Sequence, residues 1–138
     1  MPASASPTSR LVRLTDIARL TLQGDADLSA RQPAAAIDPF TQAARIQEAY
    51  LVQDFDPPAW WYPVRRSLAA ALLAEGDAAG AIREASTVLQ SWKLDPVALT
   101  IRAEAERKLG QPTARQDEAA ARSGWHGDAA QLRAAAAA

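Results

Sequence analysis

Residues 56–76 read DPPAWWYPVRRSLAAALLAEG, and this stretch decides how the rest of the chain is interpreted. Its prolines indicate a turn, its alanines and leucines an amphipathic helix, and Gly76 the left-handed residue that ends a helix. A second glycine stop of this kind is predicted at Gly110, 34 residues further along. A period of this length is typical of stacked helical repeats.

The composition favours an all-α fold for the whole chain. Alanine, the strongest helix former, accounts for 34 of the 138 residues. No segment shows the sustained alternation of apolar and polar residues that indicates a β-strand. The length is that of one domain, so we expect a single helical domain.

Charge and residue types exclude several classes of function. The 15 basic and 16 acidic residues give a net charge of −1, whereas nucleic-acid-binding domains usually carry a basic excess. The chain has no cysteine, which excludes disulfides and thiolate zinc sites. No apolar run approaches the length of a membrane span. We therefore expect no nucleic acid, membrane or cofactor as partner, and a cytoplasmic location by default.

The chain divides into three parts by composition. Residues 1–13 are rich in serine and proline without an apolar core, so we interpret them as a flexible leader and not as a secretory signal. Residues 14–132 are predicted to form the helical domain. Residues 133–138 are almost all alanine, and we expect this tail to fray.

Within the domain we predict six helices in three antiparallel pairs. They span about residues 16–30, a segment ending near 53, and then 59–75, 78–93, 97–109 and 112–122, followed by a short segment with Trp125 and Leu132. Pro39 either kinks the second helix or, with Asp38 as N-cap, begins a new one, and we favour the second alternative.

Small and large residues recur at offsets that resemble those of tetratricopeptide repeats. The matching positions are Gly24, Ala36, Phe40 and Ala43 in the first unit, Leu68, Ala69, Gly76, Asp77, Ala81 and Ile82 in the second, and Ala103 and Gly110 in the third. Ala85 and Arg115 depart from the pattern. Residues 56–68 resemble, more specifically, a segment near the C-terminal end of large bacterial tetratricopeptide proteins.

This resemblance implies a right-handed α-solenoid of about three helix pairs that acts as a scaffold or adaptor, without catalysis. In such proteins the first helix of each pair lines a concave groove that binds a protein or peptide partner. Carrying the register over places Thr21, Asp25 and Ala70 on this surface, together with the six residues that we predict to bind the partner: Arg66, Leu73, Thr100, Glu104, Arg107 and Lys108. The basic members would pair with an acidic peptide or a C-terminal carboxylate, and the alternative is a solvated helix face. A homodimer formed through the weakly apolar last helix is also predicted.

The aromatic run Trp60-Trp61-Tyr62 has two interpretations. We expect the three rings to be core residues that fill the space between the long connection and the next helix pair. The alternative is that they line a site for a small molecule, which would make the chain a helical accessory or ligand-binding domain. The single histidine, His126, does not support a metal site, and no common catalytic motif is present.

Overall fold

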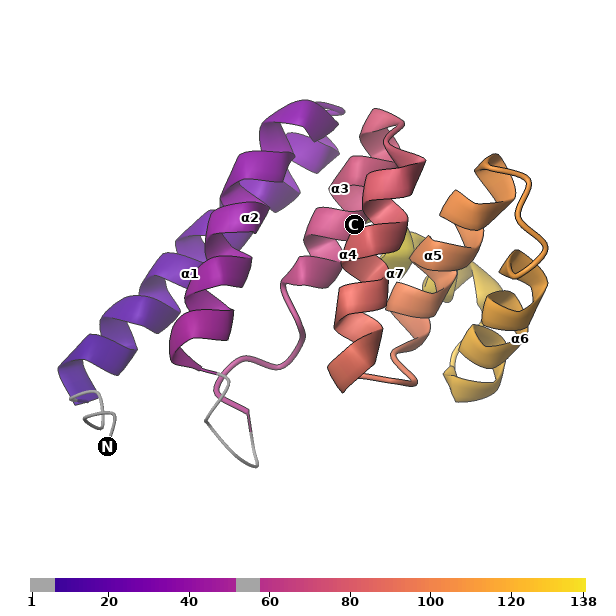
Figure 1. Cartoon of the computed structure of the whole chain (residues 1–138). Helices are drawn as coiled ribbons and strands as arrows, with labels where there is room; N and C mark the ends of the chain where they lie inside the picture. The colour runs from indigo at the N-terminus through magenta and orange to yellow at the C-terminus, as the bar shows by residue number, and fades with distance from the viewer. Residues whose placement is uncertain (1–6, 52–57) are drawn as a thin grey trace.

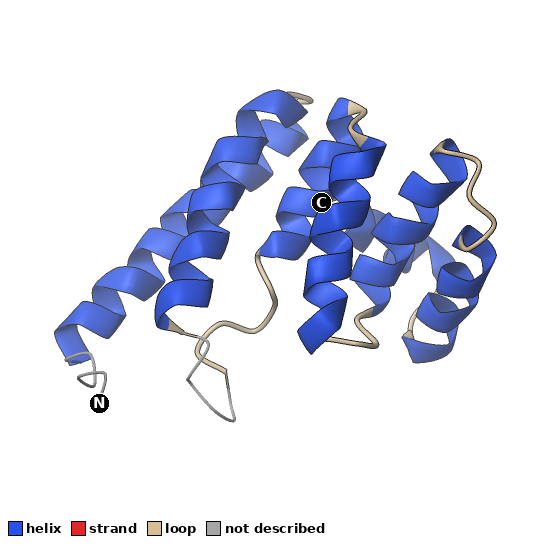
Figure 2. Cartoon of the chain, in the orientation of Figure 1, coloured by secondary structure: helices blue, strands red, loops and turns tan. Residues whose placement is uncertain are grey.

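The computed structural model describes residues 7–51 and 58–138, and these residues form an all-α structure (Figure 2). The described part contains seven helices and no strand. Their bounds are α1 Pro7–Ser29, α2 Pro33–Tyr50, α3 Arg65–Glu75, α4 Ala78–Ser91, α5 Pro96–Lys108, α6 Ala114–Gly124 and α7 Ala129–Ala137. The all-α prediction is therefore confirmed.

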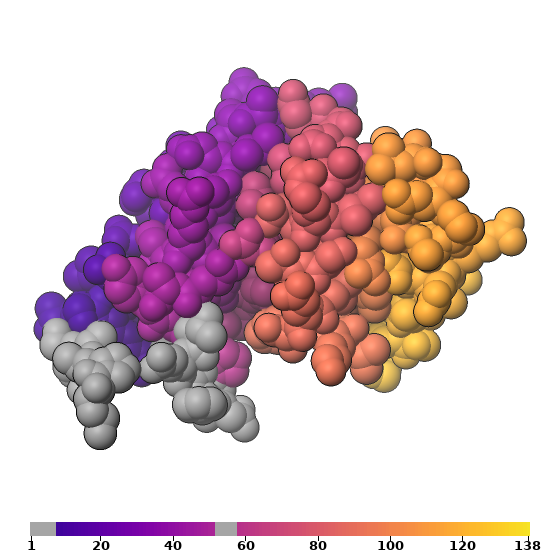
Figure 3. All heavy atoms as spheres, in the orientation of Figure 1, coloured from indigo at the N-terminus to yellow at the C-terminus, as the bar shows by residue number. Residues whose placement is uncertain are grey.

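The first six helices pack as consecutive pairs. Helix α1 packs on α2, α3 on α4 and α5 on α6, while α2 contacts α3 and α4 contacts α5 between the pairs (Figure 1). The space-filling view shows the same order laid out across one face of the molecule (Figure 3). Helix α7 departs from this order because it turns back against α5 and α3.

The predicted helix stops are present, and two aspartates cap the helices that follow. Gly76 and Gly110 both adopt positive φ, +100° and +70°, which only glycine adopts without steric strain. Asp77 and Asp95 cap α4 and α5 by accepting hydrogen bonds from the backbone N–H groups of Gly80 and Ala98, each at 2.8 Å. These signals are local, so they fix the ends of α3 and α5 and the starts of α4 and α5 independently of packing.

Helix α1 begins earlier than predicted. Residues 7–13 are helical, so the leader predicted for residues 1–13 is wrong over this part; residues 1–6 lie outside the described chain. Pro7 stands at the first helical position, where its missing N–H costs nothing. The guanidinium of Arg13 lies 4.0 Å from the ring centroid of Tyr50, which ties the early turns of α1 to the end of α2.

Pro39 lies inside α2, and the favoured prediction of a new helix at Asp38 is wrong. The helix starts instead at Pro33, and its alanine-rich first turns carry Ala36 into the core, where it is fully buried. Pro39 is itself buried beside Phe40, and burial of this whole apolar face of α2 stabilises a continuous helix against the loss of one backbone hydrogen bond. The predicted end near residue 53 lies outside the described chain.

Helix α3 begins at Arg65 and not near Ala59. The side-chain amide of Gln47 holds the preceding segment in a non-helical path, since its Nε2 donates to the Tyr62 carbonyl (2.9 Å) and its Oε1 accepts from the Val64 N–H (2.8 Å). Pro63 also pushes Tyr62 out of the α region. The three aromatic residues therefore lie in a connection and not on a helix.

The apolar core has two parts that meet at α3. The N-terminal cluster joins α1, α2 and the connection, with Ile17, Phe40 and Val64 as its largest fully buried members. The C-terminal cluster joins α3 to α7 around Ile101. Helix α3 contributes to both, through Leu68 on one side and Leu73 on the other. The core is therefore continuous along the stack.

The alanine tail is helical over residues 133–137, within α7, and the fraying expected for residues 133–138 stays a prediction. Ala136 is 6% exposed because α7 packs against α5 and α3. A seventh helix is thus added to the six that the sequence predicts.

Candidate binding surface

Helix α7 lies on a surface that α3 and α5 form together (Figure 1). Leu132 and Ala136, four residues apart and hence on one face of the helix, are buried in the C-terminal cluster. Ala135 packs against the same cluster and is partly buried. The α3–α5 surface therefore accommodates a helix, and we call it the helix-docking surface.

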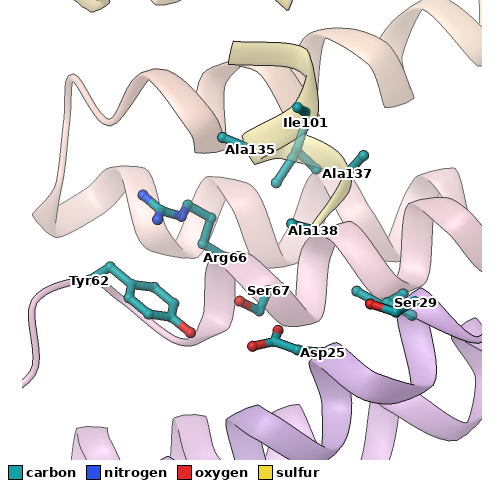
Figure 4. Close-up of a pocket in the computed structure, with 11 residues that line it drawn as sticks. Asp25, Ser29, Tyr62, Arg66, Ser67, Ile101, Ala135, Ala137 and Ala138 are labelled. Carbon is teal, nitrogen blue, oxygen red and sulfur yellow. The ribbon is translucent and has the colours of Figure 1, made fainter. Parts of the chain in front are cut away.

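A pocket of about 520 Å³ lies beside the last turn of α7. Figure 4 shows it between the end of α1, the start of α3 and the C-terminal alanines. Its lining residues are Asp25, Leu28, Ser29, Tyr62, Arg66, Ser67, Ile101, Ala134, Ala135, Ala137 and Ala138. The helix-docking surface thus continues toward α1 as a hollow that α7 leaves unfilled.

The polar side of this pocket is organised around Arg66. Its Nη1 donates to Asp95 Oδ2 at 2.8 Å, and its guanidinium carbon lies 4.9 Å from the ring centroid of Tyr62. Asp95 is also the cap of α5, so the pair fixes the start of α5 against α3. Across the pocket, partial burial raises the pKa of the Asp25 carboxyl above its ordinary value. A ligand here would meet one cation and one carboxylate.

The structure separates the six predicted partner-binding residues into two groups. Arg66 is engaged by Asp95, Leu73 is buried in the C-terminal cluster, and the Thr100 hydroxyl donates to the Pro96 carbonyl at 2.8 Å. The expectation that Leu73 forms an exposed groove contact is wrong, because it packs inside the core at 8% exposure. These three residues stabilise the helices that form the surface.

The remaining three residues, Glu104, Arg107 and Lys108, are exposed near the end of α5. Arg107 Nη2 lies 3.3 Å from Glu118 Oε2 of α6, so part of its charge is already compensated. Glu104 and Lys108 follow Ile101 by three and seven residues, which places them on the helix face that reaches the pocket. They are the charged side chains best placed to meet a bound partner.

The aromatic run divides into one core residue and two that are more exposed. Trp60 is 8% exposed in the N-terminal cluster, whereas Trp61 is 71% exposed. The expectation that Trp61 is core is therefore wrong: its ring stacks on the outer side of Trp60, with centroids 4.3 Å apart. Tyr62 is partly buried and lines the pocket beneath Arg66.

A second pocket, of about 410 Å³, opens between α2 and α4. Trp60 and Trp92 line it together with Pro63 and Arg65. The Arg65 guanidinium is held by Glu48 and Glu84, whose hydrogen bonds raise its pKa further. Arg65 is therefore unavailable as a free anion ligand, and the pocket combines its tryptophan and proline surface with the polar side chains of Gln47, Thr87, Gln90 and Ser91.

Over residues 7–51 and 58–138, no group of three or more His, Cys, Asp or Glu side chains is arranged to hold a metal ion. None of the helices in this part combines the length and apolar character that membrane crossing requires.

The sequence interpretation missed the role of residues 126–138. Asp128 and Gln131 form a capping box, in which each side chain accepts a hydrogen bond from the other residue's backbone N–H, directly before the buried Leu132. An Asp-x-x-Gln pattern ahead of an apolar residue is a helix-start signal, so the helix was predictable. The surface on which it docks was not, because two apolar positions do not specify a partner.

The chain was compared with family models, with curated proteins and with solved structures, and no match was found in any of the three.

Proposed function

We propose that this chain is a non-catalytic protein-interaction module that binds a partner segment on the helix-docking surface of α3 and α5. One observation carries the proposal: α7 already lies on this surface as a helix, with Leu132 and Ala136 buried. A surface that accepts one amphipathic helix offers the apolar contacts by which grooves recognise helical peptides.

The architecture we propose is a tetratricopeptide-like right-handed solenoid of three helix pairs followed by α7. Three features support it: the consecutive packing of α1 to α6, the left-handed glycines 34 residues apart, and the contact between Gly24 and Phe40. A Cβ atom at Gly24 would lie 2.6 Å from the Phe40 ring, so the pair needs a small residue facing a large one. Stacking of such pairs produces an extended inner surface.

The partner we propose is a protein segment with a mixed charge pattern. Glu104 and Lys108 are exposed on the same face of α5 and lie four residues apart, so they meet opposite charges on an approaching segment. Such exposed pairs contribute more to register and association rate than to affinity. Affinity would come from apolar side chains that enter the surface between α3 and α5.

Affinity capture from a native cell extract tests this function. The unmodified chain is compared with the charge-reversed variant Glu104→Lys/Lys108→Glu, and with the matched control Glu75→Lys/Arg83→Glu, which alters exposed residues of α3 and α4 outside the surface. We expect a specific partner to be retained by the unmodified chain and the control and lost by the first variant. Equal retention by all three would show that binding, if present, uses another surface.

The second candidate function is binding of a small molecule, and the pocket lined by Trp60 and Trp92 favours it. Two tryptophans at one pocket would report occupancy through their fluorescence. A saturable change in emission that Trp92→Ala abolishes would support this function.

Self-association through the C-terminal end stays a prediction, which light scattering at high concentration tests.

A further inference from the structure

We propose that α7 is an exchangeable occupant of the helix-docking surface, and that a partner helix displaces it. This inference rests on the proposed function, because it adds a competitor to the surface that binds the partner.

The contact that holds α7 is small. Of its nine residues only Leu132 and Ala136 are buried, whereas α4, packed against the same two helices, buries six residues including Val88 and Leu89. Apolar stabilisation scales with the area removed from water. The docking of α7 is therefore much weaker than that of α4.

The polar interactions of α7 are all local. Asp128 and Gln131 bond to each other's backbone N–H groups, and Trp125 Nε1 donates to the Asp128 carbonyl at 3.0 Å. Within the described residues no hydrogen bond or ion pair of a side chain joins α7 to α3 or α5. Release of α7 thus leaves no buried polar group without a partner, and the helix keeps its own cap.

The connection before α7 permits this movement. Four residues, 125–128, separate α6 from α7, and Trp125 and Asp128 both have extended backbone angles. Gly124 and Gly127 stand at and within this connection, where they lower the barrier to changes of φ and ψ. Trp125 packs against the C-terminal cluster, so the hinge lies after it, at residues 126–128, and α7 can move there while α1 to α6 stay packed.

The shape of the vacated site defines the competing helix. It must present one leucine-sized side chain and a small residue four positions later, as Leu132 and Ala136 do. The fit of its last turn is less strict, because Ala135 and Ala137 line, with Ile101 and Ser67, the pocket that α7 leaves unfilled (Figure 4), so the leucine and the small residue define the helix. We infer a partner helix of this leucine–alanine character.

The first test measures whether α7 opens independently. The chain has no cysteine, so a single cysteine reports the exposure of its own site. Ala136→Cys on α7 is compared with Ala85→Cys on α4, which is fully buried. We expect the thiol of Ala136→Cys to react with a thiol reagent at least about tenfold faster than that of Ala85→Cys. Its rate should change little when urea is added at low concentration. Equal rates with the same urea dependence would overturn the proposal.

The second test measures competition. A peptide of residues 125–138 is titrated, up to millimolar concentration, into the ¹⁵N-labelled chain and into its Leu132→Asp variant, in which α7 is expected to undock. We expect the peptide to shift the NMR signals of α3 and α5 in both chains. Half-saturation of the Leu132→Asp variant should need a peptide concentration at least about tenfold lower than that of the unmodified chain. The same peptide carrying Leu132→Asp should produce no shifts. Equal saturation in both chains, or no shifts at α3 and α5, would contradict displacement.

Two controls keep the tests decisive. If Leu132→Asp lowers the helical circular dichroism of α1 to α6, Leu132→Ala replaces it as the undocked chain. Neither test needs the natural partner, so the outcomes separate. If α7 opens independently but no partner is captured, only the proposed function is contradicted. If the unmodified chain and the Leu132→Asp variant capture the same amount of partner, only displacement is contradicted.

Discussion

Helices α2 and α7 each bury one large apolar side chain, Phe40 and Leu132, yet the two contacts differ in depth. Phe40 is fully buried, and its ring lies so close to Gly24 of α1 that a methyl group there would clash. Four further residues of α2 are buried beside it. Leu132 has one buried companion on its helix, Ala136.

The two helices also differ in their polar links. Gln47 of α2 bonds to the backbone of the connection 15 and 17 residues away, which couples α2 to the start of α3. The hydrogen bonds around α7 join residues three or four apart. These differences indicate that α2 is part of the cooperative core, whereas α7 has its own cap and docks on a surface of the other helices. Four substitutions test this contrast.

Phe40→Ala should have the largest effect. Removing a fully buried ring against Gly24 leaves a cavity, and we expect the free energy of unfolding to fall by about 3–5 kcal/mol. Chemical denaturation measures it, with Arg45→Ala, which alters an exposed residue of the same helix, as control. A loss below about 1 kcal/mol would show that Phe40 does not belong to a rigid core between α1 and α2.

Asp117→Ala should follow. Asp117 of α6 is 7% exposed and accepts hydrogen bonds from Arg102 of α5, including one from Nη2 at 2.9 Å. Its loss leaves a partly buried guanidinium without its carboxylate, at a cost of about 1.5–3 kcal/mol. The neighbouring Glu118→Ala removes an exposed ion pair with Arg107 and should cost less than about 1 kcal/mol. If the two variants lose the same free energy of unfolding, the buried ion pair does not hold α6 in place. Helix α6 would then not differ from α7 in this respect.

Leu132→Ala should cost only about 1–2 kcal/mol, below the usual range of ~2–5 kcal/mol for this change in a rigid core. The reason is that the loss cannot exceed the docking energy of α7, since α7 separates while α1 to α6 stay folded. Denaturation followed by circular dichroism measures it, with the exposed Leu94→Ala as control. A loss above about 3 kcal/mol would place Leu132 in the cooperative core.

Trp61→Ala should have the smallest effect, less than about 1 kcal/mol, because it removes a stacking contact from a residue that is 71% exposed. Trp60→Ala is the matched comparison and should cost about 3 kcal/mol or more, since that ring is buried. The melting temperatures of the two variants provide the measurement. Similar shifts would contradict the division of the aromatic run into one core and one surface ring.

The sequence predicts those features that neighbouring residues determine. Gly76, Gly110, Asp77 and Asp95 act on the backbone next to them, so the ends of α3 and the starts of α4 and α5 follow from the sequence. All-helical structure follows in the same way from alanine content.

Features that depend on distant residues were not predictable. The start of α3 depends on Gln47, which accepts a hydrogen bond from the backbone N–H of Val64, 17 residues later. Helix α2 continues through Pro39 because its apolar face, which includes Phe40, packs against α1. For the candidate surface, the exposed Glu104 and Lys108 are compatible with the predicted groove. The burial of Leu73 and the pairing of Arg66 with Asp95 required the packed structure. The docking side of α7 depends on both α3 and α5, which no local pattern encodes.

Residue-resolved amide hydrogen exchange across a series of urea concentrations tests most directly whether α7 is a separable helix on the α3–α5 surface. We expect the amides of residues 132–136 to exchange through a local opening that is nearly independent of urea and requires less free energy than global unfolding. The amides of α4, in contrast, should follow global unfolding. If residues 132–136 have the same opening free energy and urea dependence as α4, then α7 is part of the cooperative core and the account is contradicted.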